Sequence, residues 1–151
     1  MEGLELNHTG SQDKHITQAI NQLSNWKGVN HLFTVSSEVY RAFQECSGDF
    51  NPLHTDEEFA RSKGFPDKVM YGNILNVFVS TLVGECLPTK DVMIQSQELQ
   101  FKRPVFMNDE LTATMNVESV HESVNTVIFK FSFRNQCQKV VAKGKVQIGI
   151  I

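Results

Sequence analysis

A single apolar stretch near the middle of the chain, Val69 to Val83, most constrains what this sequence can fold into. Four polar residues interrupt the stretch, and it is shorter than the roughly 20 apolar residues that a membrane-spanning helix needs. It therefore predicts a long buried helix over about Val69 to Cys86, which Leu87-Pro88 ends. No membrane segment is expected here.

Beyond Val92 the apolar residues recur at every second position instead of at helical spacing. Three segments show this alternation: residues 111–117, 127–133 and 140–148. Alternation of this kind indicates strands with one face in the core. A turn around Asn135-Gln136 separates the last two segments. The pattern predicts an α+β fold in which an antiparallel sheet wraps around one long central helix.

The composition fits one globular domain rather than two. The chain has 151 residues, 40% of them apolar and 21% charged. The net charge of −3 gives no electrostatic basis for binding nucleic acid. Cys46, Cys86 and Cys137 are an odd number of cysteines without metal-ligand spacing, so we expect a reduced, cytoplasmic protein.

The first part of the chain reads as an extension, residues 1–28, ahead of a domain at residues 29–151. Ile16, Ile20 and Leu23 recur at helical spacing, which predicts a short helix that packs on the domain or on a neighbouring subunit. The N-terminus also lacks the basic start and apolar core of a secretory signal.

The segment Ser47–His54 carries the strongest chemical signal. Its Gly and Pro indicate a loop that breaks regular helix or strand. Such a loop can direct Asp49 and His54 at one small volume, where an acid and a base would activate a water molecule. A calcium-loop interpretation fails, because the required Gly falls on His54 and the final Glu on Ala60. After the loop, Thr55 is predicted to cap a short helix that ends near Gly64.

The residues of this loop resemble a known family. Cys46 to Asp56, with Ala60 following, is similar to the signature of the MaoC-like, (R)-specific enoyl-CoA hydratases, which have the hot-dog fold. Phe101 to Thr112 resembles the strand-turn-strand of that family, and Asn135-Gln136 matches its later hairpin. The resemblance extends from about residue 30 to the C-terminus.

The resemblance implies a substrate carried as an acyl thioester on the pantetheine of coenzyme A or of an acyl carrier protein, with no other cofactor and no metal. It implies that Asp49 and His54 hold a water that adds to a trans-2-enoyl thioester and gives the (R)-3-hydroxyacyl product, as in fatty-acid metabolism. It places the Gly72 N–H against the thioester carbonyl. It also implies a homodimer or higher homo-oligomer whose sheets join edge to edge.

The chain departs from the family pattern just before the central helix. Tyr71-Gly72 stands where the family has histidine-glycine, so Tyr71 is expected to change the shape of the substrate pocket. Asn51 is expected at the substrate site, where its amide would hold the loop. Asn108 replaces a turn glycine and is expected to adopt the left-handed conformation that Asn tolerates.

Two other functions stay open. A dehydratase that acts on a 3-hydroxyacyl chain bound to a carrier protein uses the same residues in reverse, and a hot-dog protein can also bind an acyl thioester without catalysis. Thioesterases of this fold often place a carboxylate on the central helix, but no Asp or Glu lies between Lys68 and Gly84. Basic residues such as Lys63, Lys68, Lys102 and Arg103 could meet the phosphates of coenzyme A or an acidic carrier protein, and the simpler interpretation is that they are scattered surface cations.

Overall fold

The computed structural model describes residues 8–151. Five antiparallel strands form one sheet in the order β1-β3-β4-β5-β2. The strand bounds are β1 Val29–Thr34, β2 Val92–Phe101, β3 Glu110–His121, β4 Thr126–Arg134 and β5 Val140–Ile150. The helix bounds are α1 His8–Ser24, α2 Ser37–Ser47, α3 Pro52–Thr55, α4 Glu57–Ser62 and α5 Ile74–Cys86, with a 3₁₀ turn at Glu122–Val124.

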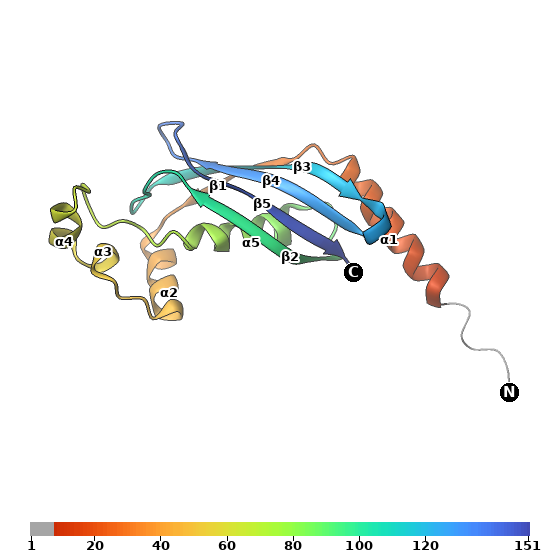
Figure 1. The fold of residues 1–151 in the computed structure, drawn as a ribbon, viewed down its shortest axis with the longest axis horizontal. Coiled ribbons are helices and arrows are strands. Elements are labelled where there is room, and N and C mark those ends of the chain that lie inside the picture. Colours follow the sequence, from red (N-terminus) through yellow and green to blue (C-terminus); the bar gives the residue numbers. More distant parts are fainter. Residues whose placement is uncertain (1–7) are drawn as a thin grey trace.

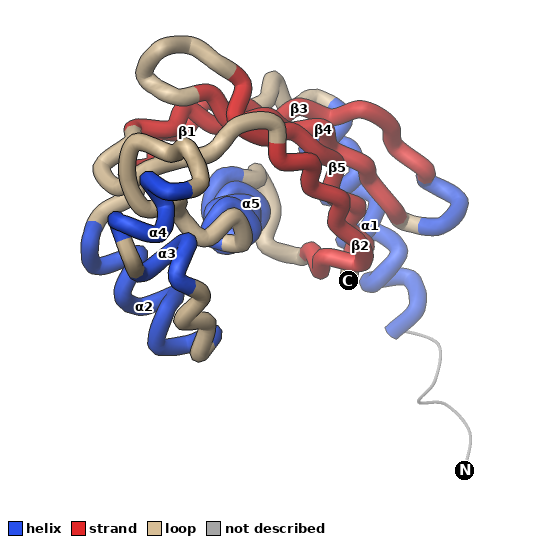
Figure 2. The backbone as a smooth tube through the Cα atoms, turned by 60° about the vertical axis from the view of Figure 1, so that its left-hand side comes forward, coloured by secondary structure: helices blue, strands red, loops and turns tan. Residues whose placement is uncertain are grey.

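The sheet arches over α5, as the sequence predicts (Figure 2). Alternate residues of β4, among them Phe129 and Phe133, are buried, and so are Val146 and Ile148 of β5. Six residues of α5 are buried as well, including Leu75 and Val79. The core therefore lies between the concave face of the sheet and the central helix.

The sequence prediction is wrong about where the central helix begins. The helix begins at Ile74, not at Val69. Residues 69–73 form an extended segment and a turn instead, and the Met70 N–H donates to the Val105 carbonyl oxygen at 2.8 Å. This hydrogen bond ties the segment to the connection between β2 and β3, and Tyr71 and Gly72 precede the helix.

The prediction of the next helix needs a correction of one residue. Asp56, not Thr55, caps α4, and its Oδ1 accepts from the Phe59 N–H at 3.0 Å. Thr55 instead ends α3, a four-residue helix that the sequence analysis took for loop. Pro52 occupies the first turn of α3, where its missing N–H has no partner to lose. His54 thus lies on a short helix.

The connection between β2 and β3 contains the predicted left-handed residue, since Asn108 has φ 65°. The buried Asp109 carboxylate accepts from the Phe106 N–H at 2.9 Å and from Gln136 Nε2 at 2.7 Å. This network ties the turn to the β4–β5 hairpin and holds the segment that faces residues 69–72.

Helix α1 lies at the opposite end of the sheet from α2, α3 and α4 (Figure 1). Its residues Ala19, Ile20 and Leu23 are buried in the core cluster. Trp26 follows the helix and meets Phe129 edge to face, with ring centroids 5.8 Å apart. The helix of the extension therefore packs on the chain's own domain. The boundary at residue 28 stays a prediction.

Candidate functional site

An open groove of about 430 Å³ lies where α3, the start of α5 and the end of β2 meet. Its lining includes His54, Val69, Gly72, Phe101, Lys102 and Val105. The groove thus brings together two of the predicted site residues, His54 and Gly72. It also adds Phe101 at the end of β2, which the loop Ser47–His54 by itself did not indicate.

His54 is held in one orientation on the side of the groove. Its Nδ1 lies 2.7 Å from the Val69 carbonyl oxygen, which can only accept a hydrogen bond. The ring also packs against Tyr71, with centroids 4.3 Å apart. Because Nδ1 donates its proton to Val69, Nε2 is the basic nitrogen. The geometry therefore equips His54 to accept a proton from a water molecule.

Asp49 lies on the exposed loop before α3, and it is not among the residues that line the groove. Its Oδ1 accepts from the Asn51 N–H at 3.0 Å, and its own N–H donates to Ser47 Oγ at 3.2 Å. Its backbone carbonyl oxygen accepts from the Tyr71 hydroxyl at 2.6 Å. Asp49 is therefore linked to the His54 side of the site through Tyr71.

Asn51 supports the loop in this structure. Its Oδ1 caps α3 by accepting from the Leu53 N–H at 2.9 Å. Its backbone N–H also meets the Asp49 carboxylate, as described above. The contacts of Asn51 are thus structural ones, and its predicted role at the substrate stays a prediction.

Gly72 has a backbone N–H that donates to no group among residues 8–151. It lies in the groove lining two residues before α5, at the positive end of the helix dipole. A Cβ at this position would lie 2.9 Å from Phe101 Cε1, so glycine allows the close approach of that ring. A free donor at a helix start suits an oxygen that gains negative charge.

Tyr71 is almost fully buried, with 2% of its surface exposed, and lies behind the groove rather than in its lining. Its hydroxyl reaches the Asp49 carbonyl while its ring supports His54. Sequence reasoning missed Tyr40 of α2, whose hydroxyl donates to the His54 carbonyl oxygen. No motif marks Tyr40, because the contact depends on how α2 packs against the loop.

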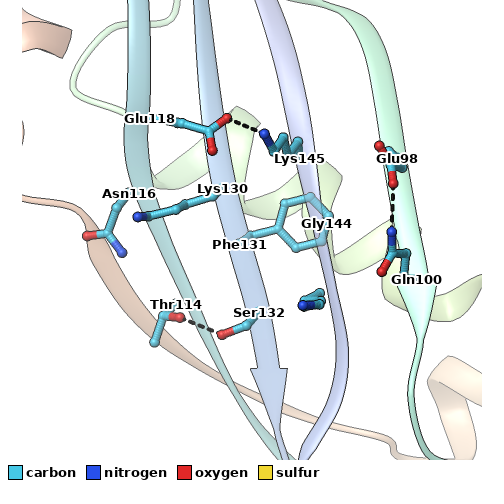
Figure 3. Close-up of a pocket in the computed structure, with 11 residues that line it drawn as sticks. Glu98, Gln100, Thr114, Asn116, Glu118, Lys130, Phe131, Ser132, Gly144 and Lys145 are labelled. Carbon is cyan, nitrogen blue, oxygen red and sulfur yellow. Dashed lines mark hydrogen bonds and ion pairs between the residues drawn. The ribbon is translucent and has the colours of Figure 1, made fainter.

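A second hollow, of about 420 Å³, lies over β2, β3, β4 and β5 (Figure 3). Several of its polar side chains pair with one another: Lys145 Nζ lies 2.8 Å from Glu118 Oε2, and Thr114 Oγ1 lies 2.9 Å from Ser132 Oγ. None of the predicted site residues lines it. The groove at His54 is therefore the stronger candidate for chemistry.

Within residues 8–151 no three His, Cys, Asp or Glu side chains gather as a metal-binding group. Among the helices of the same residues, none has the length and apolar character needed to cross a membrane.

Comparison with known proteins supports one family. The MaoC-like domain model matches residues 24–133. A mitochondrial 3-hydroxyacyl-[acyl-carrier-protein] dehydratase of Arabidopsis thaliana is 34% identical over 113 residues, which are 73% of this chain and 67% of that protein. An (R)-specific enoyl-CoA hydratase of Aeromonas caviae is 42% identical over 81 residues, 54% of this chain and 60% of that protein.

The solved structure of the (R)-hydratase from A. caviae superposes with a TM-score of 0.76 and 29% sequence identity, covering 83% of this chain and 95% of that one. Both the sequence match and the superposition therefore agree with a sheet that wraps a central helix. The chain belongs to the MaoC-like domain family and has its hot-dog fold.

Proposed function

We propose that this protein catalyses the reversible hydration of trans-2-enoyl thioesters to (R)-3-hydroxyacyl thioesters. The observation that carries the proposal is the hydrogen bond from His54 Nδ1 to the Val69 carbonyl, at 2.7 Å, which leaves a basic Nε2 beside the groove. Gly72, whose N–H has no acceptor within residues 8–151, belongs to the same lining. A base and an oxyanion donor in one groove are what addition to a conjugated thioester requires.

In the proposed reaction His54 Nε2 removes a proton from water as the water oxygen bonds to the β-carbon. The electron pair of the double bond moves toward the thioester oxygen, where the Gly72 N–H meets the charge. Asp49 orients the water, and the site then returns the proton that His54 accepted to the α-carbon, so that H and OH add across the double bond and no net charge stays on the site. The reaction changes no oxidation state, so we expect it to need no resident cofactor besides the pantetheine that carries the acyl chain.

A second candidate is dehydration of a 3-hydroxyacyl chain on an acyl carrier protein, which is the same chemistry in reverse. Lys102 and Arg103 line the groove next to Phe101. Arg103 Nη1 donates to the Val140 carbonyl oxygen at 2.6 Å, while Lys102 is exposed. A cationic rim would attract either the phosphates of coenzyme A or an acidic carrier protein.

We also propose that two copies pair along β2. This strand ends the sheet, so one side of its ten residues is free of strand partners among residues 8–151. Met93 is 56% exposed and Ile94 37%, both on the same edge strand. An open strand edge of this length, with exposed apolar residues near its ends, favours pairing with a second chain. Sedimentation of the wild type beside Ile94→Lys tests the proposal, since we expect a dimer that the charged residue weakens.

Hydration of crotonyl-CoA, followed by the loss of enoyl absorbance, tests the function directly. We expect turnover by the wild type and its loss in both Asp49→Asn and His54→Ala. The same assay with a crotonyl chain on an acyl carrier protein separates the two candidate substrates by kcat/KM. Absence of turnover with both carriers, by a protein that binds the thioester, would instead support a non-catalytic acyl-binding role.

A further inference from the structure

We propose that Tyr40 and Tyr71 act together as positioning residues, and that their hydroxyl groups hold the main chain of His54 and of Asp49 in a fixed relation. The inference rests on the proposed function of those two residues. It assigns a role to the tyrosine that departs from the family pattern, and to a second tyrosine on another helix.

The geometry of the pair is specific. The Tyr71 hydroxyl donates to the Asp49 carbonyl oxygen at 2.6 Å, and the Tyr40 hydroxyl donates to the His54 carbonyl oxygen. The two phenol rings pack against each other with centroids 5.0 Å apart. Each predicted acid–base residue is therefore held at its backbone by one member of a contacting pair.

The loop has few other means of support. Residues 45–52 are all exposed. Within residues 8–151, the hydrogen bonds of Gly48 to Asn51 come from residues 44–55, with the Tyr71 hydroxyl as the single exception. Loops with exposed hydrogen bonds and little burial open easily. Tyr71 thus supplies the one hydrogen bond that, in the described part of the chain, joins Gly48–Asn51 to the buried core.

The chemistry of the pair suits a permanent clamp. Burial raises the pKa of Tyr40, and the neighbouring Tyr71 phenol raises it further. Tyr40 consequently keeps its proton and stays a donor across the neutral range. Tyr71 is 2% exposed and packs under the His54 ring, so the same side chain touches both halves of the site. Phenylalanine would keep this packing and remove only the hydroxyl.

The test is a double-mutant cycle on kcat with the full chain. In the wild-type background we expect Tyr71→Phe and Tyr40→Phe each to lower kcat about five- to tenfold, the factor of one hydrogen bond, with KM changed less than twofold. In an Asp49→Asn background we expect Tyr71→Phe to change the residual kcat less than twofold, because its effect passes through Asp49. Ser132→Ala, which removes a hydroxyl hydrogen bond in the hollow of Figure 3, is the matched control.

An equal loss in both backgrounds would overturn the proposal, since it would make the effect of Tyr71 independent of Asp49. So would an unchanged kcat in both phenylalanine variants.

Amide hydrogen exchange tests the positioning role of Tyr71 without depending on the proposed function. If the wild type turns over no enoyl thioester, faster exchange of the Asp49 and Asn51 amides in Tyr71→Phe, and not in Ser132→Ala, still supports the clamp. Exchange rates equal to those of the wild type contradict it.

Discussion

The two ends of the molecule are built in opposite ways. At one end α2 and α3 contain no buried residue, and hydrogen bonds to backbone carbonyls hold the loop with Asp49 in place. At the other end α1 buries Ala19, Ile20 and Leu23, and Trp26 packs on Phe129. Figure 1 places these two groups of helices at opposite ends of the sheet.

The difference between the two ends indicates that one stabilises the fold and the other positions the polar groups of the site. Full burial of one large apolar side chain contributes about 1.5–3 kcal/mol, whereas a neutral hydrogen bond adds only about 1 kcal/mol. The end at α1 is therefore expected to support the fold, while the end at α3 sets the geometry of polar groups. Changes at the first end should appear in unfolding, and changes at the second in activity.

The largest expected effect is on activity at the exposed end. Asp49→Asn keeps an oxygen for the Asn51 N–H but removes the charge, and we expect kcat to fall about 10²- to 10⁴-fold, the usual contribution of an acid–base group. The free energy of unfolding should change by less than about 0.5 kcal/mol, because the residue is exposed. Enoyl absorbance and urea unfolding measure the two quantities. A large loss of stability in Asp49→Asn would contradict the idea that this end of the molecule sets activity rather than stability.

The opposite result is expected for Leu23→Ala in α1. Leu23 is fully buried, so its truncation should lower the free energy of unfolding by about 2–5 kcal/mol. The kcat at a temperature where the variant is folded should stay within twofold of the wild type. Gln22→Ala, on the exposed face of the same helix, is the control and should leave both quantities unchanged. A fall in the kcat of folded Leu23→Ala would contradict the separation.

Two glycines, Gly72 before α5 and Gly84 within it, test the same separation of activity from stability with smaller expected effects. In Gly72→Ala the new Cβ would meet Phe101 Cε1 at 2.9 Å, in the groove lining, and we expect kcat/KM to fall about tenfold, which corresponds to ~1.4 kcal/mol.

Gly84→Ala is the matched variant, since among the described residues its added Cβ would meet no atom within 4 Å beyond its chain neighbours and the backbone of its own helix. Because alanine favours a helix, it should stabilise the protein by about 0.5–1 kcal/mol and leave the rate unchanged. Thermal unfolding and the hydratase assay together check this pair. Equal rates for both variants would argue against a catalytic groove at Gly72.

The smallest effect concerns alkaline pH. Burial raises the pKa of the Tyr40 phenol and of the Cys86 thiol above their ordinary values of 10.0 and 9.0. Because the unfolded chain ionises first, the stability from these groups is present below those values and is lost as pH rises above about 9. Urea unfolding between pH 8 and pH 11 measures this loss. Tyr40→Phe should flatten the upper part of the curve, and an unchanged curve would contradict the role of Tyr40.

Much of this fold can be predicted from the sequence. Period-two alternation predicts β3, β4 and β5, because a residue on a strand with one buried face must be apolar at every second position. Gly48 ends α2 in the left-handed conformation, and Asn108 adopts the same conformation in a turn. The acid–base pair in the loop from Ser47 to His54 can also be predicted from the sequence, because the two residues lie close together in the chain.

The remaining features depend on contacts between distant segments. The apolar run by itself predicts a helix from Val69, but residues 69–73 lie outside the helix, where the Met70 N–H donates to the Val105 carbonyl oxygen. Tyr40 likewise reaches His54 only because α2 packs beside the loop. Local patterns determine strands, caps and the acid–base pair, because these obey short-range geometry. Tertiary structure alone decides which hydroxyl meets which carbonyl, because long-range packing brings those atoms together.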